Sequence, residues 1–155
     1  MPAAIVTGCV VRGNSGDGIV PGQGSMVKDC VAYSNTVNGI FVGGGCTVKD
    51  CTLRSNSLNG IKAADDCELV QNHCSNNGTA GTDAGIHVTG SRTLIDSNKV
   101  SNNVTGIQVP GTNNVIIRNI AIGNTTANYV VGGAGDVAPT GAVATSTNPW
   151  LNILN

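Results

Sequence analysis

Two consecutive stretches of 21 residues decide the fold: GIVPGQGSMVKDCVAYSNTVN at residues 18–38 and GIFVGGGCTVKDCTLRSNSLN at residues 39–59. Both begin with Gly-Ile, carry Val-Lys-Asp-Cys in the middle and end with Ser-Asn-x-x-Asn. Gly-Ile returns at residues 60–61, 85–86 and 106–107, so successive copies lie 21, 21, 25 and 21 residues apart. Internal similarity at such a period indicates a solenoid of stacked coils.

Other residue types recur in columns with the same period. One column consists of Asn14, Asn35, Asn56, Asn77, Asn103 and Asn124. We place a second column at Cys9, Cys30, Cys51, Asn72, Asn98 and Ile120, and an inward apolar column at Val11, Ala32, Leu53, Cys74, Val100 and Ile122. Asn suits turns because it tolerates a left-handed backbone, and its amide can bond to an Asn in the next coil.

Each repeat contains three short strand-like pieces separated by Gly, Asn, Asp and Ser. Strands of this length do not pair stably alone, but stacked copies can pair at about 4.8 Å. We therefore predict an all-β chain, a right-handed parallel β-helix (solenoid) of about six coils with ~21-residue repeats. A leucine-rich repeat does not fit because its fixed leucines are absent.

The pattern resembles the right-handed parallel β-helix repeat family of the pectate-lyase-like superfamily, over about residues 3–131. The resemblance implies the fold. It implies little about function, since this architecture carries lyases, hydrolases, epimerases, adhesins and phage spikes.

The repeat divides the chain into coils at residues 1–131 and a non-repetitive tail at residues 132–155. The coil after Asn77 holds extra residues at 78–84, which we read as a surface loop. Stacked coils need a cap at an open apolar end, so we predict that the tail folds back through Trp150, Leu151, Ile153 and Leu154. At the other end Ile5 and Val6 lie at an open coil edge, which predicts self-association there.

Six cysteines, at positions 9, 30, 46, 51, 67 and 74, lack the spacing of a zinc site. We expect buried reduced thiols, because stacked side chains that point the same way fit disulfide geometry poorly.

Composition excludes several classes of function. The net charge is −1 and there is no basic run, so we expect no nucleic-acid partner. No apolar stretch is long enough for a membrane span. The first residues lack the pattern of a signal peptide. Since they enter a repeat partway through, we expect a fragment of a secreted or cell-surface protein.

The best candidates for catalysis are Lys62, Asp65, Asp66 and His87. A polysaccharide lyase needs a base and acidic ligands for Ca²⁺, and Asp65, Asp66 and Glu68 are the densest acidic group. However, these acids share one turn, and no arginine is clearly placed beside them. Asp65-Asp66-Cys67 also resembles the Asp-Asp-Cys of polygalacturonases, but that family's other motifs are absent. We therefore predict no metal or cofactor, with Ca²⁺ as the alternative if the chain is a lyase.

The sequence favours a non-catalytic module, structural or surface-binding, whose outward Tyr33, Phe41, Arg54 and Lys62 contact a glycan. A carbohydrate-active enzyme (polysaccharide lyase or glycosidase), or a fragment of one, is the alternative. An oligomeric spike or adhesin rod is the third class.

Overall fold

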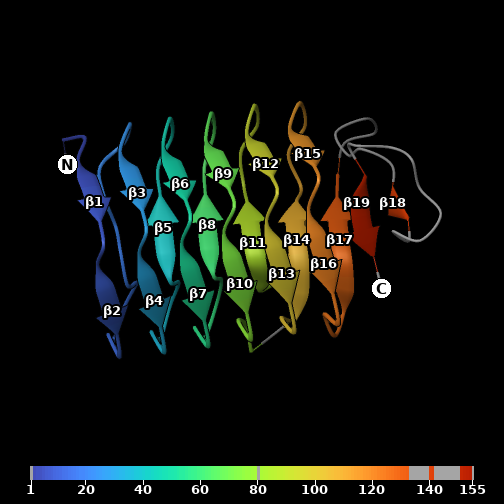
Figure 1. Cartoon of the computed structure of the whole chain (residues 1–155), viewed down its shortest axis with the longest axis horizontal. Coiled ribbons are helices and arrows are strands. Elements are labelled where there is room, and N and C mark those ends of the chain that lie inside the picture. Colours follow the sequence, from blue (N-terminus) through green and yellow to red (C-terminus); the bar gives the residue numbers. More distant parts are fainter. Residues whose placement is uncertain (1, 80, 133–139, 142–150, 155) are drawn as a thin grey trace.

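The computed structural model describes residues 2–79, 81–132, 140–141 and 151–154, and within these residues all regular structure is β. Short strands stack into three parallel sheets along one axis (Figure 1). Sheet A contains β1 (Ile5–Thr7), β3 (Met26–Lys28), β6 (Thr47–Lys49), β9 (Glu68–Val70), β12 (Leu94–Asp96) and β15 (Val115–Ile117).

Sheet B follows sheet A in every coil. It contains β2 (Val10–Arg12), β4 (Val31–Tyr33), β7 (Thr52–Arg54), β10 (His73–Ser75), β13 (Lys99–Ser101) and β16 (Ile120–Ile122), continued by β19 (Asn152–Leu154) and β18 (Thr140–Gly141). Sheet C contains β5 (Ile40–Val42), β8 (Ile61–Ala63), β11 (Ala84–Val88), β14 (Thr105–Val109) and β17 (Ala127–Val131), and an isolated bridge from Ile19 to Ile40 extends it by one coil.

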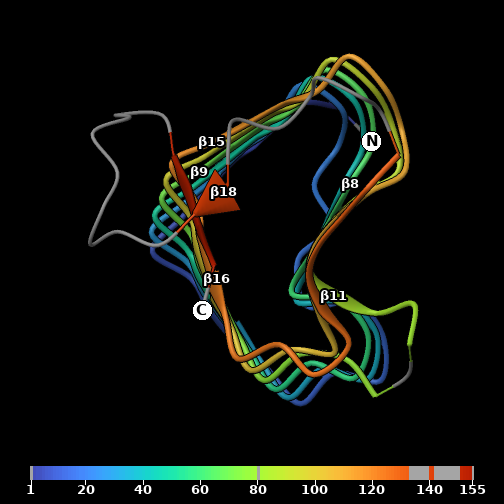
Figure 2. The ribbon, with the colours of Figure 1, turned by 90° about the vertical axis from the view of Figure 1, so that its right-hand side faces the viewer.

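The coil is right-handed, as predicted. Viewed from the end where β15 to β17 lie, the chain passes from sheet A to B to C counterclockwise while it advances toward the viewer (Figure 2). Sheet C forms the inward-bent wall of this cross-section (Figure 2). About six coils at a spacing near 21 residues confirm the fold class and the repeat.

The core is a narrow stack of small apolar side chains. The inward residue of each sheet A strand is Val27, Val48, Leu69, Ile95 or Ile116 in successive coils from β3 to β15, and all are fully buried. Sheet C contributes a ladder of isoleucines from Ile19 to Ile107. Each coil places an apolar side chain at the same position as the coil before it, so the side chains of neighbouring coils stay in contact along the axis.

Asparagine ladders close the corners. In the column from Asn14 to Asn124, each side-chain oxygen from Asn35 onward accepts hydrogen bonds from the Asn of the preceding coil, at 2.9 Å between Asn35 Nδ2 and Asn56 Oδ1. A separate ladder runs the opposite way: Asn59 Nδ2 donates to Asn38 Oδ1 at 2.8 Å, and Asn38 Nδ2 donates to Asp17 Oδ1 at 2.7 Å. These bonds satisfy buried amides that would otherwise be costly to desolvate.

Two of the predicted columns are wrong by one residue in the last coil. Asn119, and not Ile120, continues the cysteine and asparagine column, because Asn98 Nδ2 donates to Asn119 Oδ1 at 2.9 Å. The inward partner of Val100 is accordingly Ala121, and Ile122 pairs with Ser101. Only an amide can both accept from Asn98 and donate onward to Asn152, which Ile120 could not do.

The coil with the insertion differs at two places. The segment between β10 and β11 projects beyond the other coils (Figure 2), as a surface loop should. A further residue lies in the corner before β12, so the ladder partner of Asn72 is Asn98, 26 residues away. The loop at residues 78–84 and the column of Asn72 and Asn98 were predicted, whereas the place of the added residue before β12 was not.

The two ends of the stack are not alike. β1 and β2 are edge strands, and the Ile5 and Val10 side chains are 77% and 69% exposed, whereas Val6 packs against the core. Self-association through this edge stays a prediction. At the other end β19 pairs with β16. Leu151 is half-buried; Trp150 lies outside the described residues, as do the side chains of Ile153 and Leu154.

Candidate functional site

The outward side of sheet C carries apolar, aromatic, cationic and amide side chains. Its strands place one side chain per coil in a single row: Val20, Phe41, Lys62, His87, Gln108 and Val130. Side chains alternate across a strand, so the residues that flank each member of this row point into the core. Of this row, Phe41 and Lys62 were predicted to point outward.

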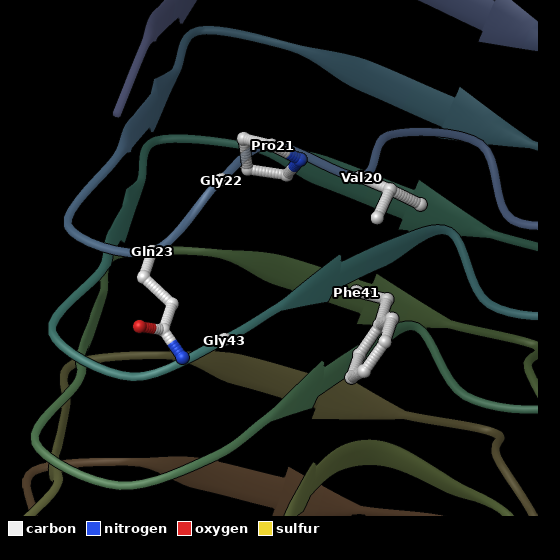
Figure 3. A pocket seen from close by; sticks show the side chains of 6 residues that line it. All are labelled: Val20, Pro21, Gly22, Gln23, Phe41 and Gly43. Atoms are coloured by element: carbon white, nitrogen blue, oxygen red, sulfur yellow. The ribbon is translucent and has the colours of Figure 1, made fainter. Parts of the chain in front are cut away.

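A shallow pocket of about 320 Å³ opens at the Phe41 end of this row. It is lined by Val20, Pro21, Gly22, Gln23, Phe41 and Gly43 (Figure 3). Phe41 presents its ring beside Val20, and the Gln23 side chain extends toward Gly43 in the next coil (Figure 3). A Cβ on Gly43 would lie 2.9 Å from Gln23 Cγ, so a larger residue here would displace the Gln23 side chain from its present position. The pocket thus combines an aromatic surface with one amide.

The four predicted binding residues divide between two faces. Phe41 and Lys62 are neighbours in sheet C. Tyr33 and Arg54 are neighbours in sheet B, where the Arg54 guanidinium carbon lies 4.7 Å from the centre of the Tyr33 ring. The Tyr33–Arg54 contact is a cation–π pair that occupies the ring face. The two pairs therefore lie on different sheets, and Phe41 of the first pair lines the pocket.

The four predicted catalytic residues also divide. Lys62 and His87 are register partners on β8 and β11. Asp65 and Asp66 lie in the corner that follows β8, where each has a structural partner. Asp65 Oδ1 accepts a hydrogen bond from the backbone nitrogen of Ser91 at 2.9 Å.

Asp66 forms a bidentate pair with Arg92, Nε to Oδ1 at 2.7 Å and Nη2 to Oδ2 at 2.8 Å. The Arg92 hydrogen bonds hold the pKa of Asp66 below its ordinary value. The expectation that no arginine stands beside the acids is therefore wrong. The usual repeat of 21 residues would place His87 above Asp66. Arg92 is 26 residues after Asp66, which is the offset in the coil that contains the insertion. Both carboxylates therefore already bond to residues of the next coil.

His87 is half-buried on its strand. Burial lowers the pKa of His87, the neighbouring Lys62 lowers it further, and Asp83 opposes them. The imidazole is consequently neutral at pH 7 and can both donate and accept a hydrogen bond. His73 lies on sheet B, where burial and then Lys99 lower its pKa.

The fold and this face define a class: right-handed β-helices with a mixed apolar and polar row on one concave wall. A model of the family described as NosD, periplasmic copper-binding protein, matches residues 3–138. The chain belongs to the NosD family. No curated protein and no solved structure matches it.

The family description names copper, which proteins hold through imidazole, thiolate or thioether groups. In the described ranges no three His, Cys, Asp or Glu side chains gather as a metal site. The two histidines lie on different sheets, and five cysteines are buried. Burial raises the pKa of the Cys30, Cys51, Cys67 and Cys74 thiols, which disfavours the thiolate that binds metal. The described residues therefore do not fit a copper centre. The same finding applies to Ca²⁺ at Asp65, Asp66 and Glu68.

Among the described residues there is also no helix of the length and apolar character needed to cross a membrane.

Proposed function

We propose that this chain is a non-catalytic β-helix module of an exported protein and that it binds a polysaccharide along the outward row of sheet C. The observation that carries the proposal is the open pocket at Phe41. Aromatic side chains offer a flat apolar surface with little conformational entropy to lose, which suits the apolar face of a sugar ring. Gln23 supplies an amide that can pair with hydroxyl groups at the rim.

The row suits an elongated ligand rather than a compact one. Successive coils repeat at about 4.8 Å, so outward side chains present contacts at a regular interval along the axis. A polymer that lies along the axis can use several of them. Export is supported by the family, whose description is periplasmic.

The enzyme alternative has less support. A glycosidase needs two carboxyl groups on opposite sides of the scissile bond, and a lyase needs acids free to hold a cation. Asp65 is bonded to a backbone nitrogen, and Asp66 is paired with Arg92. Neither carboxylate is therefore free to act together with Lys62 and His87.

Affinity electrophoresis in gels that contain a panel of neutral and acidic polysaccharides tests the proposal. We expect at least one polymer to retard the protein, and Phe41→Ala to abolish the retardation. Tyr33→Ala is the matched control, since it removes the outward aromatic residue of sheet B. If no polymer retards the protein, or if Tyr33→Ala has the larger effect, the proposal is wrong. New reducing ends or unsaturated products in the same polymers would establish an enzyme instead.

A further inference from the structure

The outward side of sheet B carries cations and no acid. Each strand from β2 to β16 points two side chains outward, so the sheet has two outward columns. One column is Val10, Val31, Thr52, His73, Lys99 and Ile120, and the other is Arg12, Tyr33, Arg54, Ser75, Ser101 and Ile122. The two columns include three cations and no carboxylate.

These three cations, Arg12, Arg54 and Lys99, are all exposed. The salt bridges of the described residues involve other cations, on sheet A and in the corners. The corner acids that follow β3 and β6 do not compensate sheet B, because each pairs with a lysine of its own coil, at 3.3 and 4.0 Å. Sheet B therefore presents positive charge that the described structure does not neutralise.

The cations of sheet B lie in alternate coils. Arg12 is on β2, Arg54 on β7 and Lys99 on β13, with one strand between each of these and the next. Each interval is thus two strand spacings, about 10 Å along the axis. A compact anion can contact only one of the three cations. A surface that presents anions at many positions can contact them all.

Tyr33 lies between Arg12 and Arg54 in the same column. The Arg54 guanidinium carbon is 4.7 Å from the centre of the Tyr33 ring. This stacking holds the guanidinium in place and leaves its edge N–H groups for phosphate oxygens, which a guanidinium binds in a bidentate manner. Exposed Val10 and half-buried Val31 add apolar surface beside the ring. Tyrosine with apolar neighbours is typical of side chains at the headgroup level of a bilayer.

We propose that sheet B is a docking face for an anionic lipid bilayer, where Arg12, Arg54 and Lys99 bind lipid phosphate groups and Tyr33 lies at headgroup level. Sheets B and C form different sides of the coil (Figure 2), so a docked chain keeps the Phe41 pocket open. The family description, periplasmic, names a compartment that is bounded by membranes. This inference does not depend on polysaccharide binding.

Sedimentation with lipid vesicles tests the docking face. Vesicles of phosphatidylcholine alone are compared with vesicles of phosphatidylcholine and phosphatidylglycerol in equal parts. We expect binding to the anionic vesicles only, and release at about 1 M salt, where charges are screened beyond about 3 Å. One Lys or Arg near an anionic bilayer contributes about fivefold in affinity. Arg54→Gln should therefore weaken binding about fivefold, and replacement of all three cations by Gln about a hundredfold.

Lys62→Gln is the matched control, because it removes one positive charge from sheet C, where Lys62 also forms no salt bridge with a described residue. This variant should bind the vesicles as the unchanged protein does. Circular dichroism of each variant shows whether it is folded.

Three results would overturn the docking face. If Lys62→Gln and Arg54→Gln weaken binding equally, the vesicles respond to net charge and not to sheet B. If the folded protein does not sediment with anionic vesicles, sheet B does not bind lipid. If polyglutamate binds instead, and the triple variant does not bind it, sheet B docks an acidic protein. None of these results changes the expected polysaccharide binding at Phe41, which gel retardation measures separately.

Discussion

Asn77 accepts two hydrogen bonds from Asn56 in the preceding coil through one side-chain oxygen, from the backbone nitrogen at 3.1 Å and from Nδ2 at 2.9 Å. Its own amide donates to the Leu53 carbonyl and to Asn103 Oδ1, both at 3.0 Å. Asn77 is 1% exposed. One side chain thus bonds to groups in the coil before it and in the coil after it.

Asn77→Ala should therefore cost about 3–5 kcal/mol in the free energy of unfolding, because it leaves several buried polar groups without partners. Urea denaturation followed by circular dichroism measures this. Asn14→Ala is the control: Asn14 is in the same column but is exposed and donates only to Asn35. A loss of about 1 kcal/mol or less is expected there. Equal losses at both positions would contradict the ladder account.

Gly60 is required by the close approach of the next coil. A Cβ at this position would lie 2.5 Å from the Gly85 carbonyl oxygen and 2.9 Å from Asn77 Nδ2. Gly60→Ala should lower stability by about 1–3 kcal/mol, since the backbone must shift to admit the methyl group. Gly16→Ala, where a Cβ meets nothing within 4 Å, should stay within about 0.5 kcal/mol of the unchanged protein. Thermal unfolding of both variants checks the difference.

Asp96 should make the stability depend on acid pH. Hydrogen bonds from Arg118, and then from Ser97, keep the pKa of Asp96 below its ordinary value. The unfolded state then binds more protons in the acid range, so stability rises with pH there. The contribution is complete above the unfolded pKa of about 4 and is lost as the pH falls through the folded pKa.

Asp96→Asn tests this linkage. We expect a loss of about 2 kcal/mol at pH 7, the value of a hydrogen bond to a charged group, and a smaller difference from the unchanged protein as the pH falls below 4. Glu68→Gln, at an exposed carboxyl on the same sheet, is the control and should change the free energy of unfolding at pH 7 by no more than about 0.5 kcal/mol. If the loss in free energy of unfolding caused by Asp96→Asn is the same at pH 3 and at pH 7, on either side of the carboxyl pKa of about 4, then Asp96 is not the group that links stability to pH.

Cys9 should react much faster with a thiol reagent than the five other cysteines. Cys9 is half-buried and the other five are buried. Burial raises the pKa of Cys51 to about 12, so little thiolate exists there at pH 8. Titration with an aromatic disulfide reagent should detect about one fast thiol in the native protein and all six in denaturant. Cys9→Ser should remove the fast phase; several fast thiols in that variant would show that the stack opens readily.

The tail should stabilise the last coil. Asn119 donates from its backbone nitrogen to Asn152 Oδ1 at 2.9 Å, and Asn152 Nδ2 donates to the Ile116 carbonyl at 2.8 Å. Deletion of residues 145–155 should lower the melting temperature clearly, by exposing this end of the core. Asn152→Ala should reproduce part of that decrease. An unchanged melting temperature in the deletion variant would refute the predicted cap.

Much of the fold follows from the sequence because each coil repeats the same local requirements. Gly-Ile begins the sheet C segment of each coil, and the asparagine column that starts at Asn14 forms one corner. An offset of 21 residues aligns these positions in most neighbouring coils. This offset brings Phe41 beside Lys62. The structure confirms that neighbourhood.

The sequence by itself determined the right-handed β-helix, the inward apolar column in all but the last coil and the outward direction of Phe41 and Lys62, because period and alternation are local properties. The predicted columns already separate Asn72 from Asn98 and Asn77 from Asn103 by 26 residues, but only the tertiary structure showed that the same offset applies to the acids after β8. One extra residue before β12 places Arg92 on Asp66 and removes that acid from the candidate chemistry. The pocket at Phe41 also could not be predicted from the sequence. Gln23 lines it from a different coil, and the spacing of residues along the chain does not show how far a side chain extends.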